Sequence, residues 1–186
     1  MATSLVEWMG MTTGILGIWL SIKERVWAWP CFVICYACYV YISYTFELPA
    51  LMLMNATFIG LSFYGWAKWI NQSSSKQQLR ISRASSWQLL LTTVFIAIGT
   101  LIFGGLIAKY GGANYPYLDA FATSCGFTAQ WMLGRKQIET WIFWMISDLV
   151  YLIIFALGSL WPTVILFSTF TALAINGWRR WRALLH

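Results

Sequence analysis

Charged side chains are scarce in this sequence, and their scarcity argues against a soluble globular domain. Only 10% of the 186 residues are charged, whereas 60% are apolar and 18% are aromatic. A soluble domain carries about 25% charged residues, so this composition cannot cover a surface that faces water. We therefore expect the chain to lie almost entirely within a lipid bilayer.

Several features that indicate catalysis or energy coupling are also missing. His186 is the one histidine, which argues against bis-histidine haem sites and against zinc catalysis that uses histidine ligands. The sequence contains no GxxxxGK[ST] loop, so we do not expect direct use of ATP. The prediction is a protein that is not an enzyme and has no cofactor and no metal site.

Seven apolar segments are long enough to cross a bilayer, for which a helix needs about 20 residues. They cover residues 5–22, 26–45, 49–70, 88–108, 115–134, 140–158 and 161–179. Because they nearly exhaust the chain, the sequence predicts an all-α membrane protein with a single transmembrane domain. The first segment contains Glu7 and has no basic start, so we expect no cleavable signal peptide.

The basic residues predict the orientation of the seven segments. If all seven cross the bilayer, one side receives eleven of the twelve lysines and arginines, and the other side receives only Lys109. Basic loops stay in the cytoplasm, so we expect the N-terminus outside and the C-terminus inside. The net charge of +6 then reflects topology, and we expect no nucleic-acid partner.

The sequence contains an internal repeat at an offset of 112 residues. Residues 7–69 align with 119–181 without a gap, separated by a linker and a further apolar segment at about 70–112. Two repeats of three segments joined by one more segment are parallel, in a 3+1+3 order. Transporters use such repeats and hold the substrate between the halves. The matching pairs are Glu7/Asp119, Gly14/Gly126, Trp19/Trp131, Trp29/Trp141, Tyr39/Tyr151, Phe58/Phe170, Gly65/Gly177, Trp66/Trp178 and Trp69/Trp181.

One face of the segment 140–158 combines aromatic rings with an acid. At spacings of three or four residues, which share a helix face, it carries Trp141, Trp144, Asp148 and Tyr151. An ionisable residue within a membrane is costly and usually lines a polar cavity, and indole faces attract cations. We expect this face to bind a flat, positively charged ring. The alternatives are that Asp148 only bonds a tyrosine hydroxyl across the bundle and that Trp141 belongs to an interfacial belt.

Further polar side chains at membrane depth are candidates for contacts with a substrate, because a buried amide needs a partner. These candidates are Asn55, Gln130, Asn176 and Tyr39. Asn55 is the stronger ligand candidate among the amides, since it stands alone among methionines and leucines in LMLMNATF. The tryptophans near basic residues are instead assigned to interfacial belts: Trp27, Trp29, Trp66, Trp69, Trp178 and Trp181.

The pair Cys35-x-x-Cys38 leaves a membrane thiol oxidoreductase as a remote alternative. Reactive pairs of this kind normally lie at the start of a helix, whose dipole favours the thiolate. This pair falls in the middle of the segment 26–45. We therefore expect the cysteines to be small packing residues.

The stretch YLDAFATSCGFTAQWMLGRKQIETWIFWMISD resembles the PnuC family of bacterial vitamin transporters, in which a YLDA…AQW…RK…W-x-x-W…D run recurs. EWMGMTTGILGIWLSIKERVWAWP and SFYGWAKW are similar to the first and third spans of that family. The resemblance implies seven spans in the bacterial inner membrane and facilitated diffusion without ATP or an ion gradient. A cytoplasmic kinase then traps the vitamin by phosphorylation, without forming a stable complex. By the same resemblance, Trp141 and Trp144 stack on the substrate, and Gln130 and Asp148 lie near it.

The resemblance implies nicotinamide riboside as the vitamin, with thiamine as the alternative and riboflavin after it. The first two present a cationic aromatic ring, which suits the acid and the indoles, whereas riboflavin is neutral and larger. The chain departs from the family pattern at Arg25, Asn55 and Thr140, where asparagine, glutamine and asparagine are common. Moving an amide changes which substrate atoms it bonds, so the vitamin stays open. A homo-oligomer is compatible with the sequence.

Overall fold

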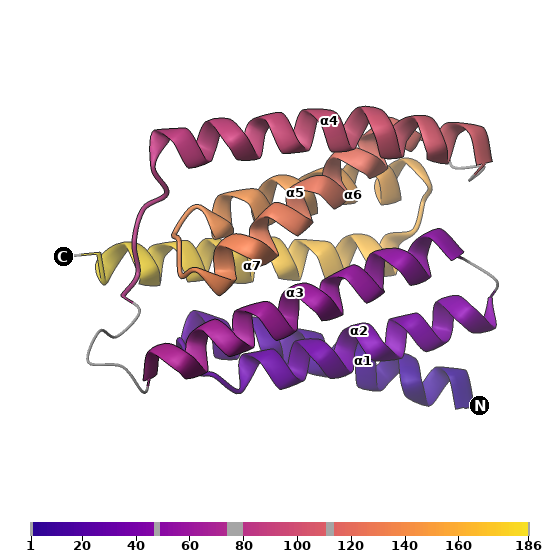
Figure 1. The fold of residues 1–186 in the computed structure, drawn as a ribbon. Coiled ribbons are helices and arrows are strands. Elements are labelled where there is room, and N and C mark those ends of the chain that lie inside the picture. The colour runs from indigo at the N-terminus through magenta and orange to yellow at the C-terminus, as the bar shows by residue number, and fades with distance from the viewer. Residues whose placement is uncertain (1, 47–48, 74–79, 111–113, 186) are drawn as a thin grey trace. The chain divides into compact units, whose positions relative to one another are not determined.

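The computed structural model describes residues 2–46, 49–73, 80–110 and 114–185, and these residues form seven α-helices (Figure 1). The helices are Ala2–Ile22 (α1), Ala28–Thr45 (α2), Pro49–Ser73 (α3), Ser86–Tyr110 (α4), Pro116–Gly134 (α5), Thr140–Leu157 (α6) and Trp161–Ala183 (α7). The prediction of an all-α chain with seven helices is confirmed, and the boundaries differ from the expected ones by a few residues. By length and composition alone, α1, α2, α4 and α6 are apolar enough to cross a membrane. The other three helices carry more polar side chains.

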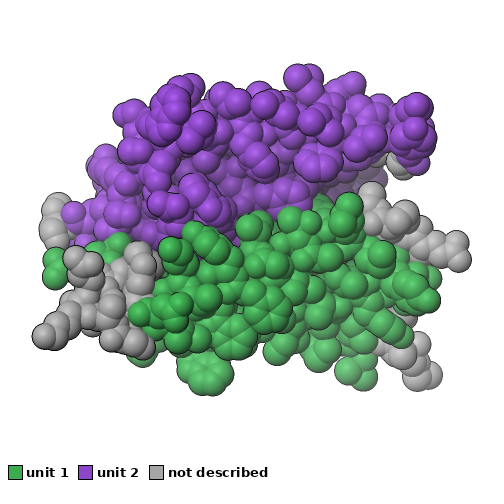
Figure 2. All heavy atoms as spheres, in the orientation of Figure 1, with its two compact units in different colours: residues 1–80 green, residues 81–186 purple. Residues whose placement is uncertain are grey.

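The chain forms two compact units, residues 1–80 and 81–186 (Figure 2). In the first unit, α2 packs against both α1 and α3. In the second unit, α5 packs against α4 and α6, and α6 packs against α7. Each unit therefore contains three consecutive helices in contact, and the linking helix α4 belongs to the second unit. The single domain and its division into two repeats stay predictions.

The turns that follow α1 and α5 have the same backbone conformation, which supports the repeat. Glu24 and Lys136 lie 112 residues apart, and both are left-handed, with φ of 54° and 51°. In each turn the next amide N–H donates to a carbonyl five positions back, to Leu20 O at 2.9 Å and to Met132 O at 3.0 Å. A non-glycine residue with positive φ is uncommon, so two at equivalent positions indicate a shared local structure.

After the α1–α2 turn, an indole ring packs directly against the backbone of α3. Trp29 is 0% exposed, and a Cβ added to Gly65 would overlap its ring. Trp69 meets the same ring edge-on, with ring centroids 5.3 Å apart and planes 88° apart. Small residues let helices approach closely in a membrane protein, where van der Waals contact drives association.

The second unit repeats this arrangement with different residues of the same types. Trp141 is 2% exposed, and a Cβ added to Gly177 of α7 would lie 2.6 Å from its ring. Trp181 meets the ring edge-on, with centroids 5.3 Å apart and planes 85° apart. All three residues are the repeat partners of those in the first unit, so the packing itself is duplicated.

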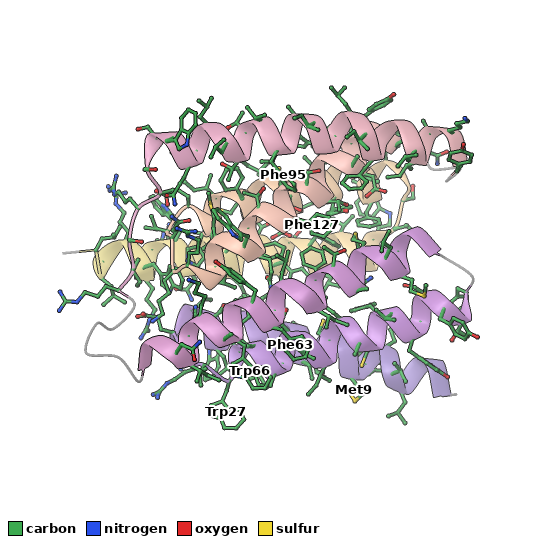
Figure 3. The ribbon with its side chains drawn as sticks, in the orientation of Figure 1. Met9, Trp27, Phe63, Trp66, Phe95 and Phe127 are labelled. Atoms are coloured by element: carbon green, nitrogen blue, oxygen red, sulfur yellow. The ribbon has the colours of Figure 1, made fainter. Side chains whose placement is uncertain are left out.

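The assignment of Trp29, Trp69 and Trp181 to interfacial belts was wrong, because all three are buried inside their own units. Their aromatic contacts are with other side chains of the same unit rather than with lipid headgroups. Trp27, by contrast, is 69% exposed and projects away from the α1–α2 turn (Figure 3). Phe63 stacks on Trp66 on α3, with ring centroids 6.2 Å apart. Phe63 is exposed and Trp66 is partly exposed, which suits contact with a bilayer.

The segment before α4 is held against the α5–α6 turn. Ser82 N–H donates to Lys136 O, and Ile138 N–H donates to Ser82 O, both at 3.0 Å. The Ala84 N–H donates to Glu139 Oε2 at 2.9 Å. These bonds fix the start of α4 to the end of the second unit at which α5 ends and α6 begins.

The glycines under the two indoles predict a specific stability defect. Gly65→Ala and Gly177→Ala each place a methyl group against a ring that cannot move away, which costs about 1–3 kcal/mol of unfolding free energy. Thermal unfolding of the purified protein in detergent should show a lower Tm for both variants.

Matched controls are available, because a Cβ at Gly60 or Gly105 meets nothing within 4 Å. Alanine is a better helix former than glycine by about 1 kcal/mol, so Gly60→Ala and Gly105→Ala should keep or raise the Tm. Equal Tm values for Gly65→Ala and Gly60→Ala would contradict the packing described here.

Candidate substrate-binding site

The candidate site is centred on a carboxylate in the middle of α6. Asp148 is only 5% exposed, in a helix apolar enough to cross a membrane. Among the residues that the structure describes, none gives its carboxylate a hydrogen bond or an ion pair. A buried charge without a partner is strongly unfavourable, so this position is suited to a guest of opposite charge.

Trp144 lies one helical turn before Asp148 and on the same side of α6. It is partly exposed, unlike Trp141, whose ring is buried against Gly177. The two tryptophans of the W-x-x-W motif therefore have different surroundings. Trp141 packs α6 against α7, whereas Trp144 is only partly buried. That Trp141 also stacks on a substrate stays a prediction.

The alignment of the two repeats distinguishes residues that both units share from residues that only one unit carries. The counterparts of Trp144 and Asp148 in the first unit are Phe32 and Tyr36. Packing residues such as Trp141 are thus duplicated, but the indole and carboxylate that could bind a cation are not.

Two hydroxyl groups of α6 fix its register against α5. Thr140 Oγ1 donates to Ala129 O, and Ser147 Oγ donates to Ala122 O, both at 2.8 Å. Gln130 follows Ala129 on α5 and is fully buried. Thr140, which differs from the family pattern, therefore has a structural contact in this chain.

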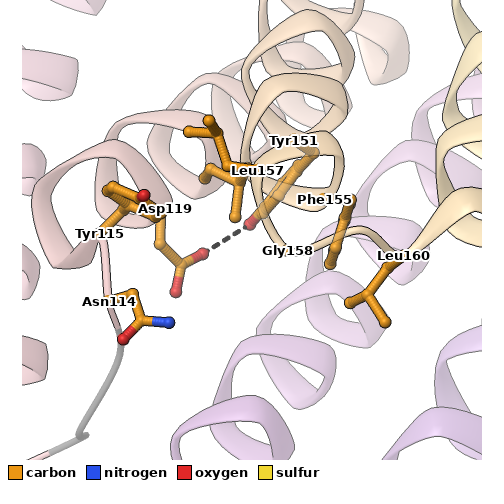
Figure 4. Close-up of a pocket in the computed structure, with 9 residues that line it drawn as sticks. Asn114, Tyr115, Asp119, Tyr151, Phe155, Leu157, Gly158 and Leu160 are labelled. Atoms are coloured by element: carbon orange, nitrogen blue, oxygen red, sulfur yellow. Dashed lines mark hydrogen bonds between the residues drawn. The ribbon is translucent and has the colours of Figure 1, made fainter.

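Tyr151 links α6 to the start of α5 (Figure 4). Its hydroxyl donates to Asp119 Oδ1 at 2.9 Å, and it lies 2.8 Å from Thr123 Oγ1, which then donates to it. The ring stacks on Phe155 at a centroid distance of 5.9 Å and lies 5.3 Å from Phe167. The acid that a tyrosine of this face bonds is thus Asp119, not Asp148.

The remaining candidates lie on other helices. Asn55 is buried in the first unit, and its Nδ2 donates to Leu51 O of its own helix at 2.8 Å. Tyr39 also belongs to the first unit, where its ring borders Gly10. Asn176 is exposed on α7. Roles for these three in substrate binding stay predictions.

A comparison with known protein families identifies the family of this chain. The sequence profile of a family described as "Nicotinamide mononucleotide transporter" matches residues 4–183, nearly the whole chain. The chain belongs to this family. It is therefore a multi-pass membrane protein related to bacterial transporters, as the resemblance to PnuC predicted.

Relatives within this transporter family cover most of the chain. It is 25% identical to the nicotinamide riboside transporter PnuC of Escherichia coli K12, over 96% of this chain and 85% of that protein. It is 21% identical to the protein of the same name from Neisseria mucosa, over 93% of this chain and 70% of that protein. A crystal structure of the vitamin B3 transporter PnuC has a TM-score of 0.77 at 20% identity, and the alignment covers 98% of this chain and 82% of that one. That likeness shows the same fold.

The sequence did not single out Asp119 and Thr123 as functional residues, although the structure places both at Tyr151. One signal was available, because the repeat aligned Asp119 with Glu7 and Tyr151 with Tyr39. The pairing of the acid with the tyrosine could not be read from it, since the two residues lie on different helices.

The different surroundings of the two motif tryptophans predict different mutant behaviour. Trp141→Ala removes a buried indole and should cost about 3–5 kcal/mol of stability, as should Trp29→Ala at the equivalent position. Thermal unfolding in detergent would test both variants, and Trp161→Ala, which removes an exposed indole of α7, is the control. A Trp141→Ala protein with wild-type Tm would show that the ring is not a packing residue.

Proposed function

We propose that this protein carries nicotinamide riboside across the bacterial inner membrane by facilitated diffusion. The observation that carries the proposal is Asp148, a buried carboxylate without a partner among the described residues, one turn from the partly open ring of Trp144. Two relatives named as nicotinamide riboside transporters support the choice of vitamin.

The chemistry of the riboside suits this face of α6. Its pyridinium ring is flat and positively charged, so it can lie against the indole of Trp144 while Asp148 balances its charge. A desolvated cation–π contact contributes about 2 kcal/mol or more. Gln130 and Asn55 are the proposed amide partners for the carboxamide and sugar hydroxyls, and Tyr151, Tyr39 and Asn176 are further candidates.

The family description names the mononucleotide, and the charges in this chain favour the riboside instead. A phosphate monoester carries about −1.5 to −2 charges at pH 7, which would be repelled by Asp148. The helix α6 contains no lysine or arginine. The basic residues of the second unit lie near or beyond helix ends. Arg83 precedes α4, and the others lie close to the end of a helix or in the turn after it: Lys109, Arg135, Lys136, Arg179, Arg180 and Arg182.

In this proposal, the trapping of the vitamin inside the cell sets the direction of net transport. A site with equal affinity from both sides only equilibrates the vitamin, because no energy source is coupled to it. A cytoplasmic kinase that phosphorylates the riboside adds the charges that the site rejects, so the product cannot return. The kinase acts downstream and needs no stable contact with the transporter.

The proposed orientation follows the basic residues, with the N-terminus outside and the C-terminus in the cytoplasm. Uptake of radiolabelled vitamin into vesicles that contain the purified protein tests the function directly. Nicotinamide riboside should equilibrate without ATP or an ion gradient, and unlabelled riboside inside should accelerate its entry by exchange. The mononucleotide should not enter. Preferential uptake of thiamine would assign the thiamine alternative.

Trp144→Ala should weaken the binding of nicotinamide riboside about tenfold or more, because a desolvated cation–π contact is lost. Isothermal titration of the purified protein measures the change, and an unchanged Tm shows that folding is intact. Trp161→Ala is the matched control for loss of an indole. Unchanged affinity would remove Trp144 from the site.

Asp148→Asn should reduce the affinity for nicotinamide riboside and thiamine more than the affinity for riboflavin. The substitution removes the charge at nearly constant shape, and only the first two vitamins carry a cationic ring to lose that attraction. Titrations with all three vitamins measure the difference. An equal loss for all three would indicate that Asp148 supports the structure rather than the charge of the guest.

A further inference from the structure

A pocket of about 290 Å³ lies where α5 begins and α6 ends (Figure 4). Its lining residues all belong to the second unit, and they include Asn114, Tyr115, Asp119, Tyr151 and Phe155. Small-molecule pockets usually measure roughly 300–1,000 Å³, so this one suits a single aromatic ring better than a large ligand. Its lining offers aromatic faces, an amide and one carboxylate.

The carboxylate of Asp119 is only partly used by the protein. Oδ1 accepts the hydrogen bond from Tyr151, and no hydrogen bond to Oδ2 comes from the described residues. Figure 4 shows this carboxylate between Asn114 and Tyr151, with its second oxygen directed away from the phenol. Oδ2 is therefore open to a positively charged group that enters the pocket.

Tyr151 connects this pocket to the candidate site. Its hydroxyl donates a hydrogen bond to Asp119, and Asp148 lies three residues earlier on the same face of α6. The combination of an acid with aromatic rings therefore occurs twice, once within α6 and once between α5 and α6. Asp148 with Trp144 forms the deeper pair, and Asp119 with Tyr151 and Phe155 forms the pair at the helix end.

The surroundings also favour a cation at this end. In the proposed orientation, α5 begins and α6 ends on the outer side, where Lys109 is the only lysine or arginine in the sequence. An approach that is poor in positive charge and contains a carboxylate raises the local concentration of cations.

We propose that this pocket is an entry subsite for a cationic aromatic vitamin, which pairs with Asp119 before it moves past Tyr151 to Asp148. The inference rests on the proposed function, because it takes the guest to be the same pyridinium compound. Asp119 acts on entry from outside, whereas Asp148 determines affinity once the guest is bound.

Asp119→Asn tests the subsite, because the asparagine oxygen can still accept the Tyr151 hydrogen bond while the charge is lost. Stopped-flow mixing of the purified protein with nicotinamide riboside at low salt should show association about tenfold slower than for the wild type. The slowing should largely vanish at high salt, which screens the interaction. The equilibrium Kd from titration should change less than twofold.

Two further variants separate charge from structure. Glu7→Gln alters the repeat-equivalent acid of the first unit and should leave the association rate at the wild-type value. Asp119→Glu keeps the charge and should recover most of the rate lost in Asp119→Asn. If both substitutions of Asp119 slow association equally, or if Asp119→Asn associates as fast as the wild type, the subsite is overturned.

Measurements on the wild-type protein distinguish failure of the subsite proposal from failure of the proposed function. If it neither binds nor transports nicotinamide riboside, the proposed function falls and the subsite falls with it. If it transports the riboside and Asp119→Asn does so with the same association rate, only the subsite is overturned.

Discussion

The helices of each unit are packed together by the contact between a buried tryptophan ring and a glycine of another helix. Trp29 fills the space that a side chain at Gly65 would take, and Trp141 does the same at Gly177. Lipid tails are as apolar as leucine, so helices in a bilayer gain little from hydrophobic burial and associate through close van der Waals contact. A large ring against glycine provides that contact, and an edge-on tryptophan completes it in both units.

Because both units share the residues of this packing contact, the positions at which the two repeats carry different residues are informative. The first unit has Phe32 and Tyr36 where the second has Trp144 and Asp148. One guest needs one set of recognition groups, so the duplicated architecture does not require duplicated chemistry. Under the proposed function, a cationic guest supplies the partner that the described residues do not give Asp148. This view also explains why the two tryptophans of one short motif have different roles.

In the proposed function, the carboxylates of α5 and α6 form a path for the guest rather than a single site. Asp119 accepts a hydrogen bond from Tyr151, which lies three residues after Asp148 on the same face of α6. Under the proposed function, a cation on this path would exchange one carboxylate for another and keep a counter-charge in a medium of low dielectric constant. A phosphorylated product would be repelled by the same groups, so the proposed arrangement of charge would favour entry of the vitamin and oppose its return.

The sequence alone predicted the helices and the family, because apolar runs are local and a bilayer requires nearly every backbone group in them to be bonded within a helix. The division into two repeats stays a prediction. The sequence also located Asp148 and Trp144, since helical spacing places residues four apart on one face. It misassigned Trp29, Trp69 and Trp181, because the interior of a membrane protein is as apolar as its exterior and composition cannot tell a packed indole from one that faces lipid. Only the tertiary structure paired Asp119 with Tyr151. The two are 32 residues apart on different helices, and their contact depends on how α6 packs against α5.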